Sequence, residues 1–68
     1  MTFWRWLQFQ DRRADAVGIL AVHALADEDW PKRARNFRTL DEYLDRCGAC
    51  DAVRAALKQA YNEWSATP

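Results

Sequence analysis

Apolar residues recur along this chain at the three- and four-residue spacings of amphipathic helices, and short polar turns separate them. The clearest stripe lies near the end of the sequence, where Val53, Leu57, Tyr61 and Trp64 follow at intervals of four, four and three residues. Such a stripe is typical of a helix that packs one face against a core. Runs of β-branched residues, which favour strands, are absent. The pattern predicts an all-α fold.

Two helices are predicted in the first half of the chain. Thr2 is a suitable N-cap for a helix over residues 3–10. A second helix should begin at Ala14 or Asp15 and end near Ala26, because an acidic triplet and a Trp-Pro pair follow, and the residue before a proline is disfavoured in the α conformation.

The second half of the chain should hold two more helices. Residues 31–36 can form one helical turn. The segment Thr39-Leu40-Asp41-Glu42 has the capping-box pattern, so a third main helix should start at Leu40. Gly48 should end it, and Asp51 should cap the last helix.

Size limits how this chain can form a core. A chain of 68 residues has room for one domain, over residues 1–68, and for one small core. Aromatic residues make up 13% of the chain and supply the large side chains that such a core needs. The residues expected to form most of the core are Trp4, Leu7, Leu20, Trp30, Tyr43, Leu44, Leu57 and Trp64.

Several short segments carry a family resemblance. They are Phe3-Trp4-x-Trp6-Leu7, Asp15-Ala16-Val17-Gly18-x-Leu20-Ala21, Trp30-Pro31 and Thr39-Leu40-Asp41-Glu42-Tyr43-Leu44. In this order and spacing they resemble the YozE-like family of small bacterial proteins with a SAM-like (sterile-alpha-motif-like) helical fold, over roughly residues 2–64. The resemblance implies a compact bundle of four to five short helices. The resemblance implies no particular activity. SAM-like folds elsewhere mediate protein or nucleic-acid contacts.

This chain differs from the family pattern in three places. Ala16 stands where a proline is common, and Ile19 and Val22 stand where polar residues are common. The pair Cys47 and Cys50 is also unexpected.

The second expected helix is apolar on both sides. The side expected to face the core carries Val17, Leu20, Ala21, Ala24 and Leu25. The opposite side carries Ile19, Val22 and Ala26, with His23 beside them. A helix that is apolar all round is either buried on every side or covers a partner, and a domain this small has difficulty burying a helix on every side.

We interpret this outer side as a partner-binding surface. Ile19 and Val22 would be the apolar anchors, His23 would lie at the edge, and Arg12 and Arg13 would form a polar rim. The partner would be another protein or a second copy of the chain. In the alternative interpretation, Ile19 and Val22 are tucked under the chain termini or scattered at the surface without function.

Charge leaves a second functional hypothesis open. Ten basic residues balance ten acidic ones, so the whole chain is not drawn to nucleic acid or to an anionic membrane. A local basic segment contains Lys32, Arg33, Arg35 and Arg38, with Asn36 and Phe37 between them. Such a segment suits phosphate contacts and base stacking, which makes nucleic-acid binding the alternative function. Acidic residues 27–29 partly cancel its field, and a solvated charged loop is the plainer interpretation.

The two cysteines have the spacing of a redox-active dithiol, or of half a zinc site. Cys47 should fall at a helix C-terminus beside Asp45, where the thiolate is disfavoured. His23 is the only other good zinc ligand, so a zinc site would need two chains. We expect buried or half-buried ordinary thiols, no metal and no cofactor.

Catalytic patterns are weak in this sequence. Ser65 and His23 are the only residues of their kinds, and the two glycines form no phosphate-binding loop. The longest apolar stretch is about half a membrane span, and no signal-peptide pattern is present. We therefore expect a non-enzymatic, cytoplasmic binding protein with no small-molecule substrate and no membrane contact.

Overall fold

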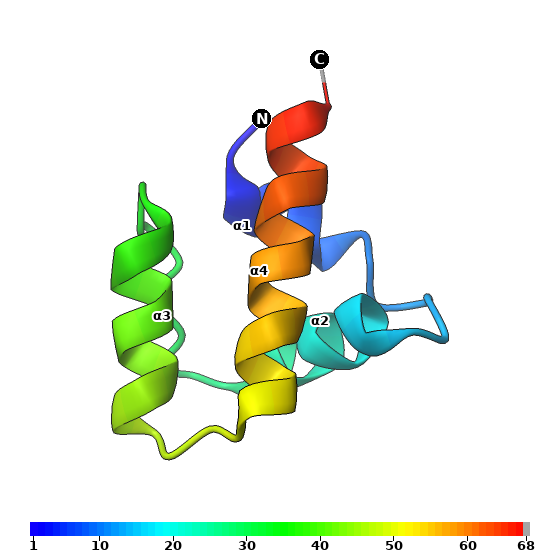
Figure 1. The fold of residues 1–68 in the computed structure, drawn as a ribbon. Helices are drawn as coiled ribbons and strands as arrows, with labels where there is room; N and C mark the ends of the chain where they lie inside the picture. The colour runs from blue at the N-terminus through cyan, green and yellow to red at the C-terminus, as the bar shows by residue number, and fades with distance from the viewer. Residues whose placement is uncertain (68) are drawn as a thin grey trace.

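The structure, a computed structural model, describes residues 1–67 and contains four α-helices (Figure 1). They are α1 (Phe3–Gln8), α2 (Ala16–Ala26), α3 (Phe37–Arg46) and α4 (Asp51–Ala66). No strand occurs among the described residues, in agreement with the all-α prediction, which is confirmed. The longest helix, α4, contacts each of the other three: α3 runs beside it, α2 crosses its N-terminal half and α1 lies near its C-terminal half.

The first helix begins at its predicted cap, and α2 begins at Ala16, one residue after the later of its two predicted starts. The Thr2 hydroxyl accepts a hydrogen bond from the backbone N–H of Arg5, at 3.2 Å. The Asp15 carboxylate accepts one from the backbone N–H of Gly18, at 3.0 Å. Helix α1 ends at Gln8, two residues earlier than predicted, and this leaves Phe9 outside the helix.

The predicted start of α3 at Leu40 is wrong. The helix begins at Phe37, and the side chain of Asn36 is its N-cap, accepting from the backbone N–H of Thr39 at 2.9 Å. Asparagine caps helices at least as well as threonine. The earlier start also brings the Phe37 ring to 5.7 Å from the ring of Tyr61. Thr39 is therefore an interior residue, and the capping box does not form.

Gly48 ends the α3 region as predicted. It has φ +74, and its N–H and that of Ala49 donate to the carbonyls of Asp45 and Leu44, both at 3.0 Å. This pair of bonds is the Schellman motif, which requires a left-handed residue. The prediction for the next helix is wrong: Cys50 is the N-cap of α4, without a side-chain capping bond, and Asp51 is the first helical residue. Its carboxylate still lies at the positive end of the helix dipole.

Trp30, in the connection between α2 and α3, is part of the core and only 5% exposed. Its ring lies 6.5 Å from that of Trp4 and 5.9 Å from that of Tyr43, so the connection joins α1 to α3. Residues 31–36 contain a hydrogen-bonded turn but no helix, so the helical turn considered for them does not form.

The core lies where α4 meets the other helices. Its buried side chains are Phe3, Leu7, Val17, Leu20, Ala21, Ala24, Trp30, Leu40, Leu44, Ala56, Leu57 and Ala60. Five of the eight predicted core residues are among them, and the other three, Trp4, Tyr43 and Trp64, are half-buried against the cluster. Four of these buried residues are alanines of α2 and α4, namely Ala21, Ala24, Ala56 and Ala60.

Polar side chains also join the helices. The Tyr43 hydroxyl of α3 donates to the carboxylate of Asp27 at the end of α2, and this bond raises the pKa of Tyr43. Arg54 of α4 forms two hydrogen bonds with Asp41 of α3, at 2.9 and 3.1 Å. These bonds lower the pKa of Asp41.

Candidate protein-binding surface

Three large apolar side chains of α2 point away from the core. Ile19 is 58% exposed, Val22 is 52% exposed and Leu25 is 43% exposed. We call these three residues the outer face of α2. Within residues 1–67, the ends of the chain leave all three side chains exposed. The inward orientation predicted for Leu25 is wrong, because α2 contacts only α1 and α4, and these helices leave the Leu25 flank uncovered.

Helix α2 carries no Asp, Glu, Lys or Arg between Ala16 and Ala26. A surface helix of a globular protein normally places charged residues on its solvent side. Fully burying one large apolar side chain contributes about 1.5–3 kcal/mol. Covering the outer face with an apolar surface of a partner would therefore be favourable.

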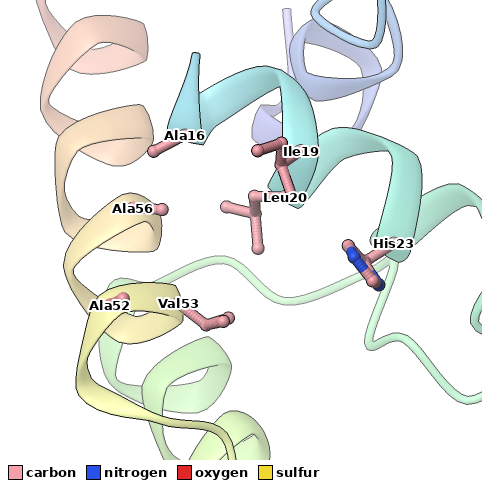
Figure 2. A pocket seen from close by; sticks show the side chains of 7 residues that line it. All are labelled: Ala16, Ile19, Leu20, His23, Ala52, Val53 and Ala56. Atoms are coloured by element: carbon pink, nitrogen blue, oxygen red, sulfur yellow. The ribbon is translucent and has the colours of Figure 1, made fainter. Parts of the chain in front are cut away.

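A hollow of about 150 Å³ adjoins this face (Figure 2). Its lining residues are Ala16, Ile19, Leu20 and His23 from α2 and Ala52, Val53 and Ala56 from α4. Figure 2 shows the short alanine side chains of α4 standing opposite Leu20 and Ile19, with His23 at the far edge. The hollow exists because alanines occupy the positions of α4 that face α2.

A second hollow of about 190 Å³ shares three of these residues, Leu20, His23 and Val53. It continues towards the C-terminal end of α2, where Asp27, Trp30 and Leu44 also line it. We call the two hollows together the α2/α4 groove. Neither hollow is lined by lysine or arginine.

Acidic residues border the groove at one end. Asp27 lines it directly, and the next residues, Glu28 and Asp29, are exposed and form no ion pair within residues 1–67. The groove is thus apolar along its floor and negatively charged at this end.

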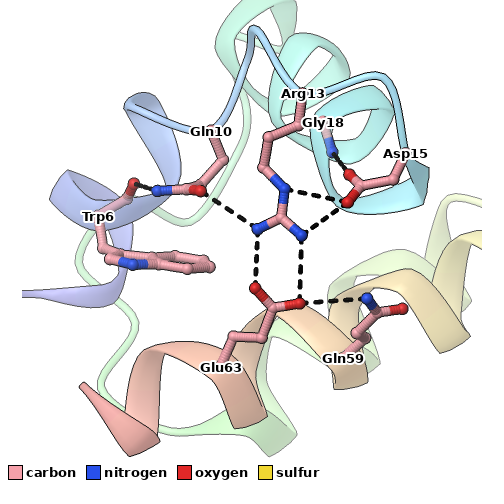
Figure 3. A network of polar contacts seen from close by, with 7 residues as sticks. All are labelled: Trp6, Gln10, Arg13, Asp15, Gly18, Gln59 and Glu63. Carbon is pink, nitrogen blue, oxygen red and sulfur yellow. Dashed lines mark hydrogen bonds and ion pairs between the residues drawn. The ribbon is translucent and has the colours of Figure 1, made fainter.

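The residues expected to form the polar rim, Arg12 and Arg13, lie in different surroundings. Arg12 is exposed. Arg13 instead bonds within the chain: its guanidinium lies 2.6 Å from Asp15 and makes two bonds to Glu63, at 2.7 and 3.3 Å (Figure 3). Gln10 accepts a further bond from it, at 3.2 Å. Arg13 also lines a hollow of about 160 Å³ with Ile19, Val22 and His23, so it lies beside the outer face while it is bonded within the chain.

This network joins the connection before α2 to the C-terminal part of α4. The hydrogen bonds from Arg13 lower the pKa of both Asp15 and Glu63. The bonds to Glu63 and then Asp15 raise the pKa of Arg13. A bond from Gln59 holds the Glu63 carboxylate in place, at 3.1 Å. The network thereby fixes the position of α2, and with it the outer face.

The four basic residues of the segment 32–38 have different surroundings. Lys32 lies over the ring of Trp4, with its Nζ atom 5.7 Å from the ring centre. Arg38 pairs with Glu42 at 3.0 Å, and Arg33 and Arg35 are exposed. Of the four predicted residues, Arg38 is thus paired with a carboxylate, and Lys32, Arg33 and Arg35 form no ion pair within residues 1–67.

Phe9 and Arg5 are surface residues that sequence reasoning missed. Phe9 is 70% exposed, and both residues line a shallow hollow on α1 together with Trp4. The helical period carried the signal, because Phe9 falls well away from the face that Phe3 and Leu7 share.

Both cysteines are exposed, so the prediction of buried or half-buried thiols is wrong. Cys47 follows the last residue of α3 and Cys50 precedes the first residue of α4, two positions at the tip of a tight connection. Within residues 1–67, no group of three or more His, Cys, Asp or Glu side chains is placed to hold a metal ion. None of the described helices has the length and apolar character needed to cross a bilayer.

Comparison of the sequence with curated proteins gave no significant match, and comparison with solved structures gave none. The family model of the YozE SAM-like fold matches residues 2–66. The match covers nearly the whole chain and includes all four helices. The chain therefore belongs to the YozE SAM-like fold family.

Proposed function

We propose that this protein is a small binding module that contacts another protein through the outer face of α2, with Ile19 and Val22 as anchors. One observation carries the proposal: an uncharged helix exposes three large apolar side chains directly beside an apolar hollow. Anchors next to pockets of this kind supply most of the binding energy of protein interfaces. His23 lies at the edge of the hollow, Arg13 lines a further hollow with Ile19 and Val22, and Arg12, its exposed neighbour in sequence, would extend the rim.

Capture experiments test this proposal. Immobilised wild-type protein should retain a partner that the variant Ile19→Lys/Val22→Glu does not retain. Phe9→Lys is the matched control, because it places a charge on an exposed apolar residue away from α2, just after the end of α1. Equal retention by wild type and by the double variant would reject the outer face as the binding surface.

We propose a binding role in preference to catalysis. His23 borders the hollow beside Val53, whereas Ser65 lies twelve residues further along α4. That separation is about 18 Å along a helix, too far for a nucleophile and its base to meet. We also propose a cytoplasmic location in a bacterial cell, since the exposed thiols of Cys47 and Cys50 suit a reducing compartment.

Nucleic-acid binding is the second candidate function. The contact of Lys32 with Trp4 favours it, because this contact connects the basic segment to the hollow that Arg5 and the exposed ring of Phe9 line. Exposed aromatic rings beside cations are suited to stacking single-stranded bases while contacting phosphates. Arg33 and Arg35 would add to the field, and Arg38 would have to leave Glu42 to contribute.

A further inference from the structure

We infer that the α2/α4 groove binds a cationic amphipathic helix of a partner protein, whose apolar side chains enter the two hollows and whose lysines or arginines meet the carboxylates at the acidic end. This inference rests on the proposed function, and it goes further by specifying the chemistry of the partner.

The dimensions of the groove fit a helix. It follows α2 from Ala16 to Asp27, a length of about 16 Å, or three helical turns. A partner helix presents apolar side chains at intervals of three and four residues over that length. Apolar cavities of about 150 Å³ accept a benzene-sized group, so each hollow has room for one large apolar side chain.

The acidic residues at the groove indicate which kind of partner helix it binds. Asp27 lines the groove, Glu28 and Asp29 follow it in sequence and are exposed, and no lysine or arginine lines either hollow. Complementary charge at the edge of an apolar interface steers association and suppresses partners of the wrong sign. Nucleic acid and anionic membrane surfaces are repelled by this end of the groove, and a basic helix is attracted to it.

The same charges argue against a second copy of this chain as the occupant. Two α2 helices that pack antiparallel would bring the acidic residues 27–29 of one copy beside Asp11 and Asp15 of the other. Arg12 is the one exposed cation at that end, because Arg13 is bonded to Asp15 and Glu63. An interface confined to one eleven-residue helix is also small beside the 20–30 residues that each partner of a standard interface contributes.

Two synthetic peptides test the inference. The first is an amphipathic helix of about 15 residues made of leucine and lysine, and the second replaces every lysine with glutamate. Fluorescence anisotropy with the whole protein should show that the lysine peptide binds at least about tenfold more tightly than the glutamate peptide. Ala52→Leu, which occupies the first hollow from an exposed position, should weaken binding of the lysine peptide with no loss of helicity.

Two charge-reversal variants distinguish attraction of the peptide by the acidic end of the groove from attraction by the net charge of the protein. Glu28→Lys/Asp29→Lys should bind the lysine peptide about tenfold more weakly than wild type does. Added salt should reduce this difference in affinity between wild type and variant. Asp11→Lys/Glu42→Lys makes the same change in net charge with exposed acids outside the groove, and it should change binding by less than about twofold.

Three results would overturn the inference. They are equal binding of both peptides, no binding of either peptide, and sedimentation showing a wild-type dimer that Ile19→Lys/Val22→Glu dissociates. The first two leave the outer face open as a binding surface for another kind of protein, which the capture experiment decides separately. The third identifies a second copy as the occupant.

Discussion

The backbone carbonyl oxygen of Arg13 lies 1.9 Å from the position that a Cβ atom would occupy on Gly18. The connection between α1 and α2 thus passes directly over the first turn of α2, at a distance that only glycine permits. The same turn receives the Asp15 capping bond at the Gly18 N–H. This crossing gives a physical reason for the glycine in the Val-Gly-x-Leu-Ala segment.

Gly18→Ala should therefore destabilise the protein, although alanine is the better helix former by about 1 kcal/mol. The added methyl group meets backbone atoms, which cannot rotate away, and we expect a net loss of about 1–3 kcal/mol. Urea unfolding followed by circular dichroism measures it. Ala55→Gly, at an exposed position of α4, is the control and should lose about 1 kcal/mol through propensity alone. A higher melting temperature for Gly18→Ala would contradict this explanation.

The Arg13 network predicts a dependence of stability on pH. Arg13 lowers the pKa of Asp15 and Glu63 below their ordinary values of 3.8 and 4.5. Carboxylates with a lowered pKa in the folded state stabilise it above their ordinary pKa, and this contribution is lost as the pH falls through the lowered value. Wild type should thus melt above Arg13→Gln at pH 7, and the difference should shrink below about pH 4.

Thermal melts between pH 7 and pH 2.5 test whether the difference in melting temperature between wild type and Arg13→Gln decreases as the pH falls. Arg12→Gln is the control, because Arg12 neighbours Arg13 but is exposed and makes no ion pair within the described chain. A difference between wild type and Arg13→Gln that is independent of pH would mean that Arg13 acts through packing and not through its carboxylate partners.

The sequence predicted those parts of the fold that short-range signals determine. Thr2 was identified as a cap because a cap and the N–H that it binds lie three residues apart. At the start of α3 two cap-forming residues compete, and the contact of Phe37 with Tyr61, which no local pattern reveals, accompanies the choice of Asn36.

For the candidate surface too, short-range signals predicted one part of the arrangement and missed the part that depends on long-range contacts. Helical periodicity identified Ile19 and Val22 as lying opposite the packed side of α2. Periodicity could not show that alanines of α4 stand opposite Ile19 and Leu20 and line a hollow there. It also could not show that Arg13 pairs with Glu63, fifty residues away in sequence. Leu25 was misplaced because its exposure depends on which helices surround α2.

Nucleic-acid binding through the basic segment predicts a steep salt dependence. Each phosphate that a lysine or arginine neutralises releases condensed counterions, so affinity should fall linearly on a log–log plot as salt rises. Arg33→Ala/Arg35→Ala/Arg38→Ala should abolish binding of a labelled single strand, and Phe9→Ala should weaken it if bases stack on that ring. Arg46→Ala, on the last turn of α3, is the control. Absence of binding at low salt would reject this function.

The proposed binding role predicts that the outer face can be made polar without harm to the fold. Ile19→Lys/Val22→Glu replaces two exposed β-branched residues with better helix formers, so helicity and melting temperature should stay close to wild type, within about 0.5 kcal/mol. Leu20→Lys, one residue from Ile19 but buried, should unfold the protein, because it places a charge in the core. Anchors of a small interface contribute about 1–3 kcal/mol each, so a micromolar complex would become undetectable in the double variant. If the double variant unfolds as Leu20→Lys does, Ile19 and Val22 are needed for folding, and the outer face loses its role as a binding surface.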